Sequence, residues 1–329
     1  MRFGLFGTGH WATVTHGRAL AVHPGVEVVG VWGRDPAKAA TLAATLGARP
    51  FTDADDLIAA VDAVAIALPP AVQADLAVRA ARAGRHLLLD KPLALDVAAA
   101  DEVVAEVSRA GVASVVFFTG RFTAAVNAFM DSHIGRSWDG AHAMMWGSIY
   151  RPGSPYAGSA WRRAHGGLWD VGPHALSVVL PLLGPVRDVA AMTGPRATTQ
   201  VLLHHDSGAV SHLTLTLDAP PASARFHTEL YGPEGIVTVP SYDEAPDVAF
   251  RTAIDQLLAT VSAGRTDHPC GVGFARDVVA VLAAADRDAT TRSPLETAAV
   301  GLDPAVAVPV ASVVGPRAVT PDAAARATL

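Results

Sequence analysis

The chain lacks several features that would assign it to special classes of protein. Cys270 is the single cysteine among 329 residues, which rules out an internal disulfide, and we interpret it as a structural thiol. No uncharged apolar run approaches the roughly 20 residues of a membrane-spanning helix. The first ten residues hold one arginine and three glycines, which interrupt any signal-peptide apolar run. We therefore expect a soluble, cytoplasmic protein.

An excess of basic charge is also missing. The 25 lysines and arginines are outnumbered by 31 acidic residues, for a net charge of −6. This balance argues against general binding of nucleic acid or anionic membranes, both of which need a basic surface. What is present is an apolar fraction of 50% with 17% charged residues, which is typical of globular proteins. The length allows two domains.

Residues 1–119 alternate short apolar runs with helical patterns. Asp35-Pro36 and Asp96 provide helix starts, because aspartate caps a helix and proline fits its first position. The regular alternation predicts an α/β domain with a doubly wound parallel sheet. Its strands are expected at 2–6, 26–32, 61–68, 86–89 and 112–118.

Residues 120–290 follow a different pattern, which predicts an α+β domain on a largely antiparallel sheet. Strands are expected at 141–150, 201–205, 210–217 and 226–231, and helices at 173–183, 252–262 and 274–285. The last two helices are expected to close this domain. His204 and His205 are neighbours in a strand and should point to opposite faces, and we predict no metal site. Residues 291–329 are rich in Ala, Val and Pro and are interpreted as an extension.

A glycine-rich loop follows the first strand and opens the first helix. Gly7 to Ala12 matches the G-x-G-x-x-G/A pattern of dinucleotide-binding folds. Gly7 allows the tight turn, Gly9 lets the backbone approach a pyrophosphate, and Ala12 permits close helix–strand packing. The helix N-terminus favours the phosphates. The predicted cofactor contacts of this loop are Gly7, Thr8, Gly9, His10 and Trp11.

The end of the second strand bears on the choice between NAD and NADP. Gly33 leaves room where NAD enzymes place a carboxylate, and Arg34 with Lys38 could meet a 2′-phosphate. The alternative is that Arg34 is solvated and Asp35 binds the ribose. We favour NADP. The carboxyl ends of later strands lie at the same edge of the sheet, and the contacts expected there are Leu68, Pro69, Asp90 and Lys91.

Three residues could carry chemistry beside this cofactor. Lys91 emerges where the nicotinamide should lie and could stabilise charge on a substrate oxygen, or it could be a solvated charge beside a turn. Pro173 puts His174 in the first turn of a helix, whose dipole disfavours imidazolium, so the neutral ring could exchange a proton with an alcohol. Asp170 could orient this ring or could cap the helix.

As a set, these motifs resemble the glucose–fructose oxidoreductase / inositol dehydrogenase / MocA-like family. The resemblance runs from Arg2 to about Ala285 and includes the glycine loop, Asp90-Lys91-Pro92 in place of Glu-Lys-Pro, and the segment 166–174. It implies Lys91, Asp170 and His174 as the catalytic group. Asp90 replaces the family's glutamate, and this shorter carboxylate could position Lys91 differently. Ser177 replaces an aspartate that many members carry, so the substrate contacts could differ from those of the family.

The resemblance also implies partners and a substrate class. It places Arg121, Trp161 and Arg162 near the substrate, and it implies a homo-oligomer packed through the open face of the C-terminal sheet. Leu213, Leu215 and Leu217 could supply an apolar stripe there or could face the domain's own helices. We expect an NAD(P)-dependent oxidoreductase of a sugar, cyclitol or polyol. The alternatives are a non-catalytic dinucleotide or sugar sensor and a reductase of a dihydrodiol or a linear-tetrapyrrole-like ketone.

Overall fold

The computed structural model describes residues 1–241 and 243–291. The predicted extension therefore lies outside the described residues, apart from Thr291. The first half forms a parallel sheet, as the alternating pattern predicts, in the order β3-β2-β1-β4-β5-β6, and its edge strand β3 was not predicted. Its strands are β1 (Arg2–Phe6), β2 (Glu27–Trp32), β3 (Arg49–Phe51), β4 (Ala63–Ile66), β5 (His86–Asp90) and β6 (Ser114–Phe117).

Helices connect these strands, and their starts follow the predicted caps. The Asp35 carboxylate accepts hydrogen bonds from the N–H groups of Ala37 and Lys38, and Asp96 accepts one from Ala99. The first helix differs from the prediction because a π-helix, Ala12–Gly17, precedes its α-helical part. The α-helices are α1 (Arg18–Val22), α2 (Pro36–Thr45), α3 (Ala54–Ala59), α4 (Pro70–Arg82) and α5 (Val97–Ala110).

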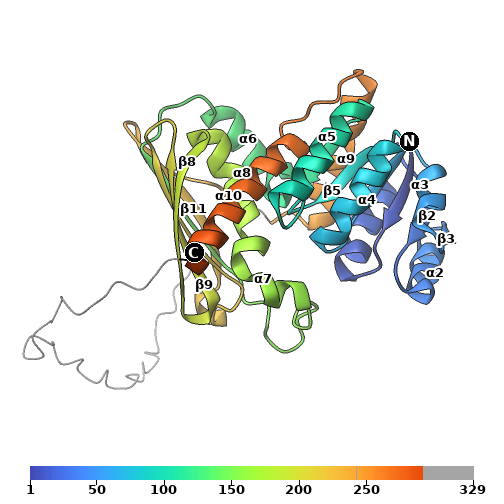
Figure 1. The fold of residues 1–329 in the computed structure, drawn as a ribbon, viewed down its shortest axis with the longest axis horizontal. Helices are drawn as coiled ribbons and strands as arrows, with labels where there is room; N and C mark the ends of the chain where they lie inside the picture. Colours follow the sequence, from blue (N-terminus) through green and yellow to red (C-terminus); the bar gives the residue numbers. More distant parts are fainter. Residues whose placement is uncertain (242, 292–329) are drawn as a thin grey trace, which may run out of the picture. The chain divides into compact units, whose positions relative to one another are not determined.

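The second half is built on a mixed sheet in the order β12-β11-β7-β10-β9-β8 (Figure 1). The pair β10–β7 is parallel and the other pairs are antiparallel, so the prediction of a largely antiparallel sheet is confirmed. The edge strands β8 and β12 were not predicted. The strands are β7 (Gly140–Trp146), β8 (Val186–Gly194), β9 (Thr198–His205), β10 (Val210–Thr216), β11 (Arg225–Gly232) and β12 (Gly235–Thr238).

Helices lie against one face of this sheet (Figure 1). They are α6 (Ala124–His133), α7 (Ala160–Asp170), α8 (Gly172–Leu183) and α10 (Val272–Thr291). Leu213, Leu215 and Leu217 are at most 2% exposed and face these helices, so they cannot form a stripe on the open face. That face instead carries Leu202 and Met192, which are 49% and 59% exposed, and no described helix covers it.

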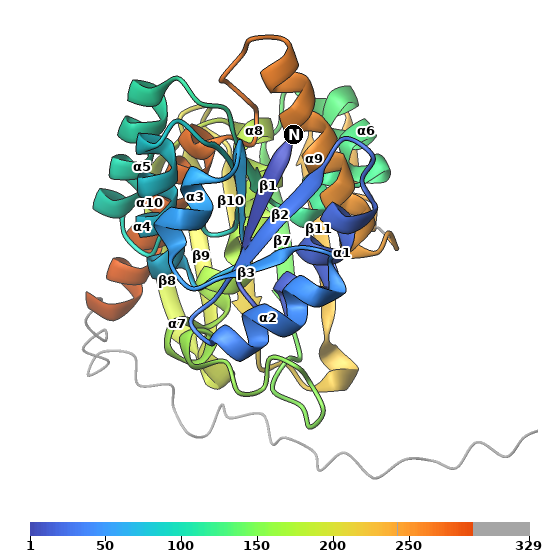
Figure 2. The same ribbon diagram turned by 90° about the vertical axis from the view of Figure 1, so that its right-hand side faces the viewer.

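Helix α9 (Pro246–Ser262) returns the chain to the first sheet, which differs from our expectation that it closes the second domain. It packs against α1 and β6, as the neighbouring positions of α9 and α1 in Figure 2 show. Phe250 of α9 is fully buried and meets Phe117 of β6 edge-on, with 4.9 Å between ring centroids. Helix α10 packs both on β8 of the second sheet and on α5 of the first half, so the two halves are joined by a late helix as well as by the chain after β6.

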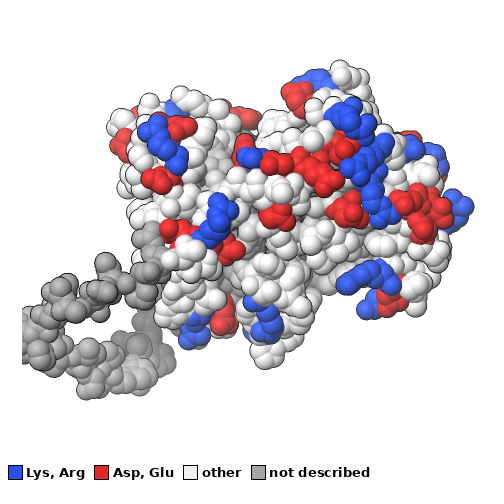
Figure 3. All heavy atoms as spheres, viewed as in Figure 1, with Lys and Arg blue, Asp and Glu red and all other residues white. Residues whose placement is uncertain are grey.

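The outer surface mixes charges of both signs. Basic and acidic side chains alternate over α4 and α5 in the face shown in Figure 3, where Arg82 pairs with Glu102 and Glu106. Cys270 is buried, and burial raises the pKa of its thiol, which keeps it protonated. None of the described helices is both long enough and apolar enough to cross a membrane.

Candidate active site

A pocket of about 680 Å³ lies at the carboxyl ends of the first sheet's strands, where it faces α7 and α8. The two halves of the chain therefore both contribute walls. Eleven of the predicted site residues line it, namely Gly9, His10, Trp11, Leu68, Pro69, Asp90, Lys91, Trp161, Arg162, Asp170 and His174.

The glycine loop fits a dinucleotide. Gly7 has φ of +129°, and a Cβ at this position would lie 2.5 Å from the carbonyl oxygen of Ala67, so only glycine is accommodated. A Cβ on Gly9 would meet nothing within 4 Å, so open space lies in front of the following helix. The N–H groups of a helix's first turn have no partner within the helix. This open, donor-lined space can hold a pyrophosphate.

The region around Gly33 differs from the sequence interpretation. A Cβ on Gly33 would lie 2.6 Å from Cγ2 of Thr8, so the Thr8 side chain fills the space that we expected to be free. The Asp35 carboxylate is engaged in capping α2 and lies 3.8 Å from the Lys38 ammonium. Arg34 is exposed and has no ion-pair partner among the described residues. The guanidinium of Arg34 can therefore meet a phosphate.

Buried hydrogen bonds fix the loop that carries Lys91. The fully buried Gln73 of α4 accepts from the backbone N–H of Asp90 at 2.9 Å and donates to the backbone carbonyls of Asp90 and Pro92 at 2.7 and 3.1 Å. The Asp90 carboxylate accepts from the backbone N–H of Lys91 at 2.8 Å. The Asp90 carboxylate thus bonds to the backbone of its own loop, and the Lys91 side chain points into the pocket.

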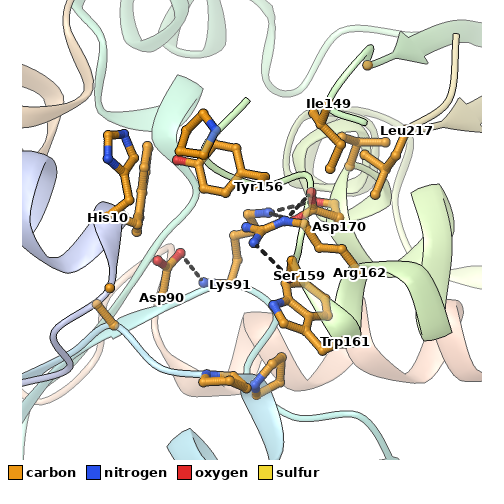
Figure 4. A pocket seen from close by; sticks show the side chains of 18 of the residues that line it. His10, Asp90, Lys91, Ile149, Tyr156, Ser159, Trp161, Arg162, Asp170 and Leu217 are labelled. Carbon is orange, nitrogen blue, oxygen red and sulfur yellow. Dashed lines mark hydrogen bonds and ion pairs between the residues drawn. The ribbon is translucent and has the colours of Figure 1, made fainter. Parts of the chain in front are cut away.

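Two cations converge on one carboxylate in the pocket (Figure 4). Nζ of Lys91 lies 3.0 Å from Oδ1 of Asp170 and also donates to its backbone carbonyl at 2.5 Å. Nε of Arg162 donates to Oδ2 of Asp170 at 2.9 Å. Burial alone would raise the pKa of Asp170, but the charges and hydrogen bonds of Lys91 and Arg162 lower it to about 2. Asp170 is therefore an anion that holds both cations, and it does not cap α8.

His174 lies in the first turn of α8, as predicted, and lines the same pocket. Burial of its ring, followed by the nearby charge of Lys91, lowers its pKa to about 3. The imidazole is therefore neutral at ordinary pH and can accept a proton. Ser177, one turn later, donates its hydroxyl proton to the carbonyl oxygen of His174 and does not line the pocket.

Arg162 is held between two aromatic rings. Its guanidinium carbon lies 4.6 Å from the ring centroid of Tyr156 and 4.8 Å from that of Trp161. Its Nη1 also reaches the hydroxyl of Ser159 at 3.5 Å. Tyr156 in turn contacts the ring of His10 edge-on at 5.8 Å, across the pocket from the second half to the glycine loop. Arg162 therefore has a fixed direction toward Asp170.

The remaining predicted residues do not line this pocket. Its lining does not include Gly7, Thr8, Gly33, Arg34 and Lys38. Arg121 is buried, and its Nη1 donates to the carbonyl oxygen of Ser177 at 2.6 Å. It lines a second cavity, which lies behind α8.

Sequence reasoning missed several residues that line the pocket. They are Thr119, Ile149, Tyr156, Ser159, Leu217 and Phe226. Tyr156 and Ser159 belong to the Gly-, Pro- and Ser-rich segment 151–160, whose composition indicates a loop but no direction. Ile149, Leu217 and Phe226 belong to apolar strand patterns, which do not distinguish a pocket wall from a core.

Comparison with known proteins covers both halves of the chain. A family model described as the GFO/IDH/MocA oxidoreductase family with an NAD-binding Rossmann fold matches residues 1–118. A second model, described as the GFO/IDH/MocA C-terminal domain, matches residues 139–238. The family that the motifs indicated is therefore confirmed.

Individual relatives agree with this assignment. The chain is 27% identical over 307 residues to dTDP-3,4-didehydro-2,6-dideoxy-alpha-D-glucose 3-reductase of Streptomyces antibioticus, covering 80% of this chain and 89% of the relative. It is 36% identical over 104 residues to UDP-N-acetylglucosamine 3-dehydrogenase of Acidithiobacillus ferrooxidans, about a third (32%) of each chain. The WlbA dehydrogenase from Bordetella pertussis, solved with NADH and UDP-GlcNAcA, shares the fold with a TM-score of 0.74, 24% identity, and coverage of 88% of this chain and 96% of that one. The chain belongs to the GFO/IDH/MocA family of NAD-binding oxidoreductases.

Proposed function

We propose that the chain transfers hydride between a nicotinamide cofactor and a secondary alcohol or ketone of a sugar, cyclitol or related polyol. The observation that carries this proposal is the meeting of Lys91, Asp170 and His174 in one pocket beside a glycine loop that fits a dinucleotide. The relatives named above include sugar-nucleotide reductases and dehydrogenases, which supports a carbohydrate substrate.

The three side chains have complementary roles. The Lys91 ammonium donates a hydrogen bond to the substrate oxygen and stabilises negative charge that develops there. The neutral imidazole of His174 takes the hydroxyl proton during oxidation and returns it during reduction. Asp170 fixes the position of Lys91 with the help of Arg162. The bound nicotinamide supplies the chemistry of hydride acceptance and donation.

We further propose that the cofactor is NADP. Arg34 is exposed and without an ion-pair partner among the described residues, while Asp35 is engaged at the start of α2. A guanidinium can bind a 2′-phosphate through paired hydrogen bonds. Thr8, which fills the space at Gly33, places a hydroxyl beside the expected ribose site.

The expected homo-oligomer through the open face of the second sheet is also retained as a proposal, with residues other than the leucine stripe. The open face of the second sheet carries the exposed apolar side chains of Met192 and Leu202. A second copy of the chain would cover them. Replacement of Leu202 by Glu is then expected to shift the mass measured by light scattering toward the monomer.

The direct test of activity uses purified protein with each cofactor and a panel of free and nucleotide-linked sugars and cyclitols. Oxidation is followed as the rise in NADPH or NADH absorbance. Turnover of at least one sugar or cyclitol is expected. Tight cofactor binding without turnover of any panel member would contradict the proposal and favour a sensor.

A further inference from the structure

One wall of the pocket consists of apolar side chains from three neighbouring strands. Ile149 follows β7, Leu217 follows β10 and Phe226 lies in β11, and these strands are adjacent in the order β11-β7-β10. The backbone N–H of Ile149 donates to the carbonyl of Leu217 at 3.0 Å, and the two side chains lie together in Figure 4. We call Ile149, Leu217 and Phe226 the apolar wall.

The polar groups of the pocket are gathered elsewhere. Lys91 and Arg162 are directed at Asp170, and His174 lines the pocket from α8. The side chains of the apolar wall have no hydrogen-bonding atom, and the neighbouring Gly147 has no side chain. A substrate with its reacting oxygen at Lys91 therefore has hydrogen-bonding partners at the reacting centre but none from side chains of the wall.

This division has a consequence for the substrate. A hydroxyl placed against an apolar wall loses its hydrogen bonds to water without replacement, which is unfavourable. A methyl or methylene in the same place gains from burial. An apolar pocket commonly discriminates by about 10- to 100-fold against an added hydroxyl.

We infer that the pocket selects deoxy sugars, that is, hexoses that lack a hydroxyl at a carbon facing the apolar wall. This inference rests on the proposed hydride transfer at a sugar and names the substrate class for the same site. The discrimination comes from Ile149, Leu217 and Phe226, while Lys91 and His174 act on the reacting carbon.

The test compares matched substrates in the oxidative direction. D-glucose is compared with 2-deoxy-D-glucose and 6-deoxy-D-glucose, and dTDP-α-D-glucose with its 6-deoxy counterpart. In at least one pair we expect kcat/KM for the deoxy sugar to exceed that of its parent by about tenfold or more. A preference for the fully hydroxylated parents would overturn this inference alone. No turnover of these or of any other sugar or cyclitol would overturn the proposed function as well.

Two small substitutions identify the wall as the cause. Phe226→Tyr adds one hydroxyl to a side chain that is 59% exposed, and Ile149→Thr keeps the β-branched shape. Either change is expected to lower the ratio of kcat/KM for the deoxy sugar to kcat/KM for its parent by about threefold or more. The reason is that the introduced hydroxyl can form a hydrogen bond with the hydroxyl of the parent sugar. Ile236→Thr, at a 70% exposed position of β12 outside the pocket, is the control and should leave the ratio unchanged. Unchanged ratios in both wall variants, with unaltered thermal midpoints, would contradict the assignment.

Discussion

Nζ of Lys91 lies 3.0 Å from Oδ1 of Asp170, although 79 positions separate the two residues in the chain. Lys91 follows a strand of the first sheet, and Asp170 ends a helix that packs on the second sheet. Since neither residue can hold the other until both halves have folded and docked, the polar centre is a product of the tertiary structure. The carboxylate is shared with Arg162, so its removal affects two cations.

Replacement of Asp170 by Asn should therefore destabilise the protein. The change leaves the partly buried Lys91 and Arg162 facing each other without an anion. Removing one partner of a buried ion pair typically lowers the free energy of unfolding by about 3–5 kcal/mol. We expect a loss of this size for Asp170→Asn in urea denaturation. Asp206→Asn, which removes an exposed pair with Arg187, is the matched control and should cost at most about 1 kcal/mol. Equal losses in the two variants would show that the buried carboxylate has no special role.

The ionisation of His174 predicts how stability depends on pH. Its pKa is lowered from 6.5 to about 3, so between these values the unfolded chain binds a proton that the folded chain does not. The free energy of unfolding should consequently be largest above pH 6.5 and should decline as the pH falls toward 3. In His174→Asn this decline should be shallower between pH 6 and 4.5, where the lowered pKa of Asp170 contributes little. Parallel curves for the two proteins in urea titrations would count against a neutral, half-buried His174.

Cofactor choice should depend on Arg34. Arg34→Ala removes the exposed guanidinium that we place against the 2′-phosphate. One charge-assisted hydrogen bond contributes about 1.5–3 kcal/mol of binding free energy. Its loss should therefore weaken NADPH binding by about tenfold or more. The affinity for NADH should stay within about twofold, because it lacks that phosphate. Both are measured by nicotinamide fluorescence, with Arg187→Ala as a surface control. Tighter binding of NADH than of NADPH by the unchanged protein would instead move the ribose contact to Thr8 or Asp35.

Gln73 should hold the Lys91 loop in place. Gln73→Met preserves the approximate size of the side chain but leaves the backbone N–H of Asp90 and the carbonyl of Pro92 without their buried partner. The expected loss of unfolding free energy is about 2 kcal/mol or more, and kcat should fall with it. Gln256→Met, at a half-buried residue of α9 that bonds to His268, is the comparison. An unaltered kcat would show that the loop keeps its position without Gln73.

The sequence allowed the parallel sheet, the helix starts at Asp35 and Asp96, and the family to be predicted, because these follow from local patterns. Strand β8 escaped prediction because it is an edge strand with few buried residues. Helix α9 was assigned to the wrong layer because an amphipathic pattern shows that one face is buried but not what covers it. Patterns along the chain gave no indication that α9 would pack against α1.

The candidate site was predictable in its motifs and less so in its contacts. Lys91, Asp170 and His174 lie together in the pocket. The contact between Arg162 and Asp170 was not foreseen, because the two residues are separated by the kink at Gly166, where φ is +64°. Arg121 lies behind α8 because its side chain turns toward the carbonyl of Ser177, a direction that no spacing reveals.

Lys91 and His174 are proposed to act directly on a substrate that the cofactor oxidises or reduces. The most direct measurement determines cofactor affinity and turnover of the best panel substrate in the same preparations of the unchanged protein and of Lys91→Ala, His174→Ala. We predict a turnover lower by about a thousandfold or more, since general acid–base and electrostatic contributions are lost together. The cofactor Kd should rise by far less than this factor, because Lys91 is only one of the expected cofactor contacts. Turnover that survives unchanged in the double variant would contradict the catalytic roles proposed for Lys91 and His174.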